Sequence, residues 1–305
     1  MKKAFLAGLI AITLLTSGFV FPSNQPGYSL SRQLTNATET AVPTNTPTAT
    51  VDPALTLKTL TAISEQNGGI YGTPTVQWAE VETGQKVTVP ILLYHHISDD
   101  GEDIRYYVDP EDFRIQMEML KKLGYTTITI ADLYQVIEQG GQLPNRPLVI
   151  TFDDGDEDVY LNAYPIMKKL GMVGVFYIVA NRLNLPGFVS GDEILELNKN
   201  GWEIGCHGMT HIDLKKDANL NNEMYQSRLL LEKELGIPIY SFAYPLGSAD
   251  AFIMKKAMTY GYKNAVGLGE GYVHSGNSIY YLSRMEIRRS TSLENMLSML
   301  PWNTP

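Results

Sequence analysis

The residues most able to do chemistry lie in ITFDDGDED, residues 150–158, where five acidic side chains occupy six positions directly after an apolar run. Like charges this close raise one another's pKa, so the stretch is either a solvated acidic turn or the partner of something positive. At the end of a strand, Asp153 and Asp154 would point to different sides, which lets one bind a metal while the other stays unliganded. We expect the three later acids to begin the next helix, whose dipole favours them.

A second candidate group is HGMTH, in which His207 and His211 are spaced i, i+4 after the apolar segment WEIGC. On a helical turn this spacing places both imidazoles on one face. Two imidazoles and a carboxylate suit zinc or a similar divalent ion with an open position for water. The alternative is a structural histidine pair. Cys206 is the single cysteine, which excludes a disulfide framework and a multi-thiolate zinc site, and we expect it to be a small buried residue.

The elements that must position these groups alternate regularly from residue 90 onward. Apolar strand patterns such as VPILLYHHI and PLVITF are separated by helical patterns of 10 to 15 residues. Such alternation is typical of an α/β fold with a mainly parallel sheet, and we expect a distorted or incomplete (β/α) barrel, with an open doubly wound sheet as the alternative. In both architectures the carboxyl ends of the strands carry the functional residues.

Four segments together resemble the polysaccharide deacetylase family, the NodB-homology or carbohydrate esterase family 4-like proteins. They are VPILLYHHI, LPNRPLVITFDDGDEDVYLNAYPIMKKLG, EIGCHGMTHIDL and FAYPLG, spread over roughly residues 88–290. The match is nearest to the exported poly-N-acetylglucosamine deacetylase-like branch. The resemblance implies a NodB-type (β/α) barrel and metal-dependent removal of N-acetyl groups from an N-acetylglucosamine polymer of the cell wall or extracellular matrix.

Carried over residue by residue, the resemblance makes Asp153 the general base and Asp154, His207 and His211 the ligands of one divalent ion. The donor set favours Zn²⁺, with Co²⁺, Ni²⁺, Fe²⁺ and Mn²⁺ as alternatives. The family's oxyanion donor is a backbone amide, and the matching residue is Leu246.

For the proton donor and for the residue that orients the base, this sequence departs from the most common motifs of the family. His95, in an early Leu-Tyr-His, is the expected general acid, and Arg284 is the expected partner of the base because Ala243 stands where many members have arginine. His96 should face away from His95, and His274 should be a surface loop residue. Gly208 replaces the serine or threonine that often follows the first metal-binding histidine, which suggests that a hydrogen bond bracing the loop is lost.

These departures keep two alternatives open beside the deacetylase. One is an O-acetyl esterase of the xylan type, and the other is a catalytically weak carbohydrate-binding protein. A net charge of −9 argues against nucleic acid and against an anionic membrane surface as partners. The expected partner is a polysaccharide; the sequence gives no indication of oligomeric state.

The pattern of the N-terminal residues predicts that the protein is exported. Residues 1–22 begin with two lysines before an uncharged apolar stretch, the pattern of a signal peptide or an uncleaved N-terminal membrane anchor. Residues 23–53 form a Thr/Pro-rich linker that we expect to be disordered. Residues 54–87 lead into a deacetylase domain at 88–305. We therefore expect a protein that is secreted or attached to the outer face of the membrane or the cell wall.

Overall fold

The computed structural model describes residues 76–100, 105–216 and 219–303. All of these residues belong to one compact unit. The predictions of a signal peptide or anchor, of a linker, and of a lead-in up to residue 75 concern segments outside the described residues. Within the described ranges, no helix has both the length and the apolar character that crossing a membrane requires.

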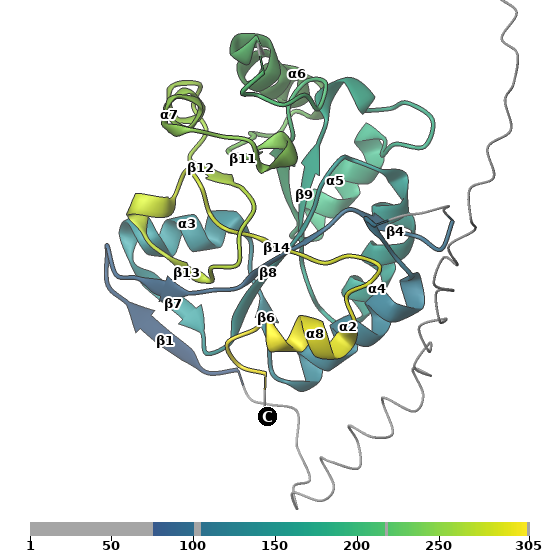
Figure 1. The fold of residues 1–305 in the computed structure, drawn as a ribbon, viewed down its shortest axis with the longest axis vertical. Coiled ribbons are helices and arrows are strands. Elements are labelled where there is room, and N and C mark those ends of the chain that lie inside the picture. Colours follow the sequence, from purple (N-terminus) through teal and green to yellow (C-terminus); the bar gives the residue numbers. More distant parts are fainter. Residues whose placement is uncertain (1–75, 101–104, 217–218, 304–305) are drawn as a thin grey trace, which may run out of the picture. The chain divides into compact units, whose positions relative to one another are not determined.

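A parallel sheet forms the centre of the domain (Figure 1), and its strand order is β12-β11-β10-β9-β8-β3-β14, with β6 beside β8. The strands are β3 (Ile91–Tyr94), β6 (Thr126–Thr127), β8 (Pro147–Phe152), β9 (Val175–Ile178), β10 (Glu203–Cys206), β11 (Ser241–Ala243), β12 (Asn264–Val266) and β14 (Met285–Glu286). Every pairing among them is parallel. The sheet is a half-barrel, which confirms the expected α/β fold with an incomplete barrel.

Helices connect the strands of the sheet, and most of them cover its outer face (Figure 1). They are α2 (Pro110–Lys122), α3 (Ile130–Gln139), α4 (Tyr164–Lys169), α5 (Gly191–Lys199), α6 (Ser227–Leu235), α7 (Ala251–Thr259) and α8 (Leu293–Ser298). Side chains cap several of them, for example Asp109 at α2 and Thr129 at α3. Two expected helices begin as π-helical turns, η1 (Val159–Ala163) before α4 and η3 (Asn221–Gln226) before α6.

The two faces of the sheet belong to two separate hydrophobic clusters. Leu92, Ile150 and Phe176 point into the cluster shared with the outer helices. Ile91 and Val149, their neighbours in sequence, point into a second cluster on the opposite face. Successive side chains of a strand alternate between faces, so the residues that continue the second face beyond the strand ends share one side. Asp153 continues that face from Val149.

Short antiparallel and parallel pairs complete the domain. Strand β1 (Trp78–Val81) pairs with β7 (Gly141–Pro144), and β2 (Val87–Thr88) pairs with β13 (Val273–His274). Strand β4 (His96–Ile97) pairs with β5 (Tyr107–Val108). Strand pairing therefore joins the end of the expected lead-in to the domain.

The prediction for His274 is wrong. Its side chain is 2% exposed on β13 instead of lying on a surface loop. The ring nitrogen Nε2 is 3.0 Å from the carbonyl oxygen of Val89, to which it donates. Pairing of β13 with β2 pulls the residue inward, and burial lowers its pKa to about 4.

Candidate active site

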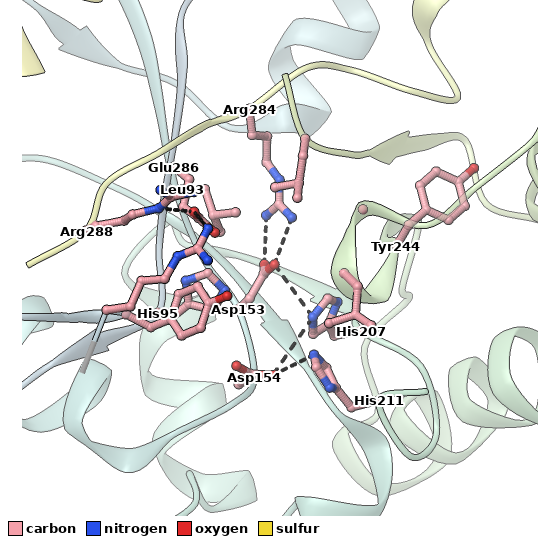
Figure 2. A pocket seen from close by; sticks show the side chains of 15 residues that line it. Leu93, His95, Asp153, Asp154, His207, His211, Tyr244, Arg284, Glu286 and Arg288 are labelled. Carbon is pink, nitrogen blue, oxygen red and sulfur yellow. Dashed lines mark hydrogen bonds and ion pairs between the residues drawn. The ribbon is translucent and has the colours of Figure 1, made fainter. Parts of the chain in front are cut away.

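A cleft of about 230 Å³ opens where the strands end, and every site residue selected from the sequence lines it. Figure 2 shows Asp153 and Asp154 at its centre with the two histidines on one side. The selected residues that line the cleft are His95, Asp153, Asp154, His207, His211, Leu246 and Arg284. They come from the ends of β3, β8, β10 and β11 and from the start of β14, so the parallel sheet gathers residues that are far apart in sequence.

Asp154, His207 and His211 form a triad whose ligand atoms all lie within 4.8 Å of one another. Asp154 leaves the strand with φ 72°, which turns its carboxylate toward the histidines. Its Oδ1 is 3.2 Å from His211 Nε2 and 3.9 Å from His207 Nε2. One carboxylate and two imidazoles are a donor set that binds Zn²⁺ and other divalent ions with positions left open.

His207 is held in the form that a metal ligand requires. Its Nδ1 donates to the carbonyl oxygen of Ala243 at 2.8 Å, so Nε2 is the nitrogen that faces the triad. Burial lowers the pKa of His207, against the opposing effect of Asp153 and Asp154, and this favours the neutral imidazole. The residues present therefore fit a divalent cation.

The histidine pair does not lie on a helical turn, so that expectation is wrong. The segment from His207 to His211 is a loop without regular secondary structure. Gly208 has φ 86° and His211 has φ 61°, and these left-handed residues fold the loop back so that the two rings meet at 4.9 Å between centroids. The pair converges through loop geometry and not through helical spacing.

Glu223, which the sequence analysis did not select, braces this loop. The side chain is 2% exposed. Its Oε2 accepts hydrogen bonds from the amides of Met209 and Thr210 at 3.0 and 2.9 Å, and its Oε1 accepts one from the Thr210 hydroxyl at 2.8 Å. A Cβ on Gly208 would lie 3.3 Å from the same carboxylate. Although Gly208 has no side chain to support the loop, the hydrogen bonds from Glu223 on η3 hold the loop in place.

Asp153 is held by Arg284 in a bidentate ion pair. Both N–O distances are 2.7 Å, and both side chains are almost completely buried. Burial alone raises the pKa of Asp153, but the Arg284 guanidinium outweighs it and holds that pKa well below its usual range. Asp153 Oδ2 is also 3.6 Å from His207 Nε2, so an ionised carboxylate stands beside the triad without belonging to it.

The support of Arg284 depends on Gly205. The Arg284 guanidinium lies 5.4 Å from the centre of the Tyr177 ring. A Cβ on Gly205 would lie 2.3 Å from that ring, so only glycine on β10 leaves the ring its space. The Tyr177 hydroxyl is fixed in turn by Ser241 Oγ at 2.7 Å. This packing orients the guanidinium toward Asp153.

His95 lies on the wall of the cleft, at the end of β3. Its Nδ1 is buried, and no hydrogen-bond partner for it lies among the described residues. The ring contacts Tyr106 with 4.8 Å between centroids. Burial lowers the pKa of His95, although Asp153 and Asp154 pull it upward. Its role as general acid stays a prediction.

Leu246 also lines the cleft, in the short helix η4 (Pro245–Gly247) after β11. Its backbone has φ 59°, and its side chain is 60% exposed. The leucine therefore contributes to the rim of the cleft. Its amide stays the candidate oxyanion donor.

Two of the three remaining acids of the ITFDDGDED stretch, Asp156 and Asp158, contact His96. Asp158 Oδ2 is 2.8 Å from His96 Nδ1, and Asp156 Oδ2 is 3.5 Å from His96 Nε2. Asp158 precedes η1, but its side chain makes no capping hydrogen bond there. His96 does face away from His95, as expected, and it stacks on Tyr107 at 3.9 Å. Only the tertiary structure reveals this second use of the acidic stretch.

Comparison with known proteins identifies the family. The family model described as polysaccharide deacetylase matches residues 140–265. A Bacillus anthracis protein assigned to the polysaccharide deacetylases is 30% identical, with 70% of this chain and 69% of that chain covered and a TM-score of 0.64. A Streptococcus pyogenes deacetylase solved with acetate is 25% identical, with 71% and 99% covered and a TM-score of 0.65.

A curated relative has a more specific name. The poly-β-1,6-N-acetyl-D-glucosamine N-deacetylase of Staphylococcus aureus is 27% identical over 213 residues, 63% of this chain and 72% of that protein. The site combines a triad that could hold a metal ion with a carboxylate beside it, an arrangement suited to hydrolysis. The chain belongs to the polysaccharide deacetylase family.

Proposed function

We propose that this chain is an exported enzyme that uses one divalent ion, Zn²⁺ in the first place, to hydrolyse N-acetyl groups of a glycan containing N-acetylglucosamine. The observation that carries the proposal is the pair Asp153–Arg284 beside a separate triad of Asp154, His207 and His211. The relatives named as deacetylases, one of them acting on poly-β-1,6-N-acetyl-D-glucosamine, support the reaction and the substrate class.

The arrangement assigns a task to each group. A divalent ion held by the triad would supply a Lewis acid that polarises the acetyl carbonyl and makes water more acidic. Asp153 is ionised and oriented by Arg284, so it can accept the proton of the attacking water on the side that faces His207. His95, on the cleft wall, would deliver a proton to the departing amine. The Leu246 amide would donate to the developing oxyanion.

Acetate release from chitooligosaccharides, peptidoglycan and poly-β-1,6-N-acetylglucosamine tests the proposal, with acetylated xylan as the ester comparison. We expect one of the first three to be the preferred substrate, loss of activity after chelation, and recovery on adding Zn²⁺. Asp153→Asn should lower kcat by about 10²-fold or more, because it removes the base. Asp192→Asn, an exposed position on α5, is the matched control.

Two results would contradict this function. Activity that survives both chelation and Asp153→Asn would exclude the mechanism. Exclusive turnover of acetylated xylan would replace the amide substrate by an ester. Metal analysis of the purified protein identifies the ion, and a stoichiometry of one zinc per chain is expected.

Export is tested separately. Cell fractionation and N-terminal sequencing of the protein from its natural source should place it outside the cytoplasm, with or without residues 1–22. Recovery of the full-length chain only in the cytoplasm would exclude the proposed location.

A further inference from the structure

The segment from Arg284 to Arg288, which contains β14, presents charged residues to the cleft at every second position. Arg284, Glu286 and Arg288 line the cleft, whereas Met285 and Ile287 between them are buried on the other side, 2% and 0% exposed. This is the alternation that a strand imposes on successive side chains. Within the run RMEIRR, Arg284 therefore pairs with Asp153, and Glu286 and Arg288 add two more charges along the same face.

Arg105 is brought to the same place by the backbone. The Arg289 amide donates to the Arg105 carbonyl at 3.1 Å, which joins the two segments at the edge of the cleft. Arg105 Nη2 then lies 3.5 Å from Glu286 Oε2, and Arg288 Nε bonds the same oxygen. In Figure 2, Glu286 and Arg288 lie on the side of Asp153 away from His207 and His211.

The charges on this side of the cleft do not balance. Arg284 is matched by Asp153, and Asp154 belongs to the metal triad. Two guanidinium groups then remain against the one carboxylate of Glu286, in a protein whose net charge is −9. The arginine side chains are 55% and 41% exposed, so their ion pairs with Glu286 are weak and can be exchanged for a ligand.

We propose that Arg105 and Arg288, with Glu286 between them, form a subsite for an anionic substituent of the glycan, a carboxylate or a phosphate, close to the sugar that is deacetylated. Guanidinium groups match both anions through paired hydrogen bonds. Tyr106 lines the same wall, 39% exposed, and its ring lies 5.2 Å from the Arg105 guanidinium and 4.8 Å from the His95 ring. This inference rests on the proposed function, since it describes the substrate of the same cleft.

The test uses oligosaccharides that differ only in charge. The first alternates N-acetylglucosamine with N-acetylmuramic acid bearing a free lactyl carboxylate. The second is its methyl ester, and the third is the ester with a 6-phosphate. For the wild type we expect kcat/KM to be about 10-fold or more higher for a charged form than for the ester, mainly through KM, because hydrogen bonds to charged groups contribute this much. The charged form that shows the advantage identifies the anion.

The variant Arg105→Gln/Arg288→Gln should bring that ratio close to one. Arg289→Gln, an exposed neighbour that does not line the cleft, should keep the wild-type ratio. Arg288→Lys should keep part of it, since the charge remains and the paired geometry is lost. Thermal unfolding of each variant checks that the fold is intact. A wild type indifferent to charge, or a double variant that retains the preference, overturns the subsite.

The failure of this subsite and the failure of the proposed function are distinguishable. Calorimetric Kd values of the same three oligosaccharides are measured on the wild type whether or not acetate is released. Tighter binding of a charged form without any acetate release supports the subsite and rejects the hydrolase. Acetate release with equal Kd and KM for all three rejects only the subsite.

Discussion

Arg284 and Asp153 are 131 residues apart in sequence, yet the guanidinium of one forms two hydrogen bonds of 2.7 Å with the carboxylate of the other. Neither side chain has appreciable contact with solvent. A carboxylate this deeply buried would hold its proton without a partner, because burial raises its pKa. The arginine therefore keeps the proposed base ionised and fixes the direction of its oxygen atoms.

Removing the Arg284 partner should damage both stability and catalysis. Arg284→Gln leaves Asp153 as an unpaired buried group, so we expect the free energy of unfolding to fall by about 3–5 kcal/mol. Among molecules that remain folded, kcat should fall by about 10²-fold while the metal stays bound. Urea unfolding, acetate release and metal content measure the three quantities. Arg289→Gln, at an exposed position, is the control. The stability and kcat of Arg284→Lys should lie between those of the wild type and of Arg284→Gln. A wild-type kcat in Arg284→Gln would show that Asp153 does not need this partner.

Glu223 should determine metal affinity without touching the metal. Its carboxylate holds the amides of Met209 and Thr210, between the two histidines of the triad. Outer groups that orient ligands typically contribute 10–100-fold to metal affinity, so we expect Glu223→Ala to raise the Zn²⁺ Kd by about that factor. Competition with a chromogenic chelator measures the Kd directly. Glu234→Gln on α6 is exposed and serves as control, and an unchanged Kd in Glu223→Ala would limit Glu223 to a role in folding.

Gly205→Ala should disturb the support of Arg284. The added methyl group would lie 2.3 Å from the Tyr177 ring, which has to move together with the guanidinium that rests on it. Overpacking of this kind costs about 1–3 kcal/mol. We expect lower stability and a lower kcat, and the double variant Gly205→Ala/Tyr177→Phe should recover neither, because the clash is with ring carbons. The matched control is Gly191→Ala, because its added methyl group would meet no atom closer than 3.7 Å and should be tolerated. Gly171→Ala is unsuitable, since a φ of 66° there would strain alanine for a different reason. A Gly205→Ala variant with wild-type stability would contradict the packing argument.

His274 should make the domain less stable in acid. Its pKa in the folded protein is about 4, against about 6.5 in the unfolded chain, so the unfolded state binds more protons between these values. The free energy of unfolding should therefore fall as pH is lowered from about 6.5 to 4, by roughly 3 kcal/mol from this residue, and its contribution should level off below pH 4.

The variant His274→Gln isolates this contribution. Glutamine can still donate to the Val89 carbonyl, as Nε2 of the histidine does, but it does not titrate. Urea unfolding at several pH values should show a shallower pH dependence for the variant than for the wild type. Parallel curves for the two proteins would exclude His274 as the source.

Local sequence patterns were enough to predict the secondary-structure elements and the identity of the central site residues. The strand and helix patterns between residues 90 and 300 and the segments TFDDG and HGMTH are local signals, since periodicity and strand-end position depend only on neighbouring residues. Asp153, Asp154, His207 and His211 could be selected on that basis.

The contacts that hold these groups in place could not be predicted from the sequence, because they join segments that are far apart along the chain. Glu223, on η3, forms hydrogen bonds with the loop between the two histidines. His96 contacts Asp156 and Asp158, and the pairing of β13 with β2 buries His274. Arg105 joins Glu286 across 181 positions. Contacts of this kind depend on which distant segments the fold brings together, and local sequence patterns do not contain that information.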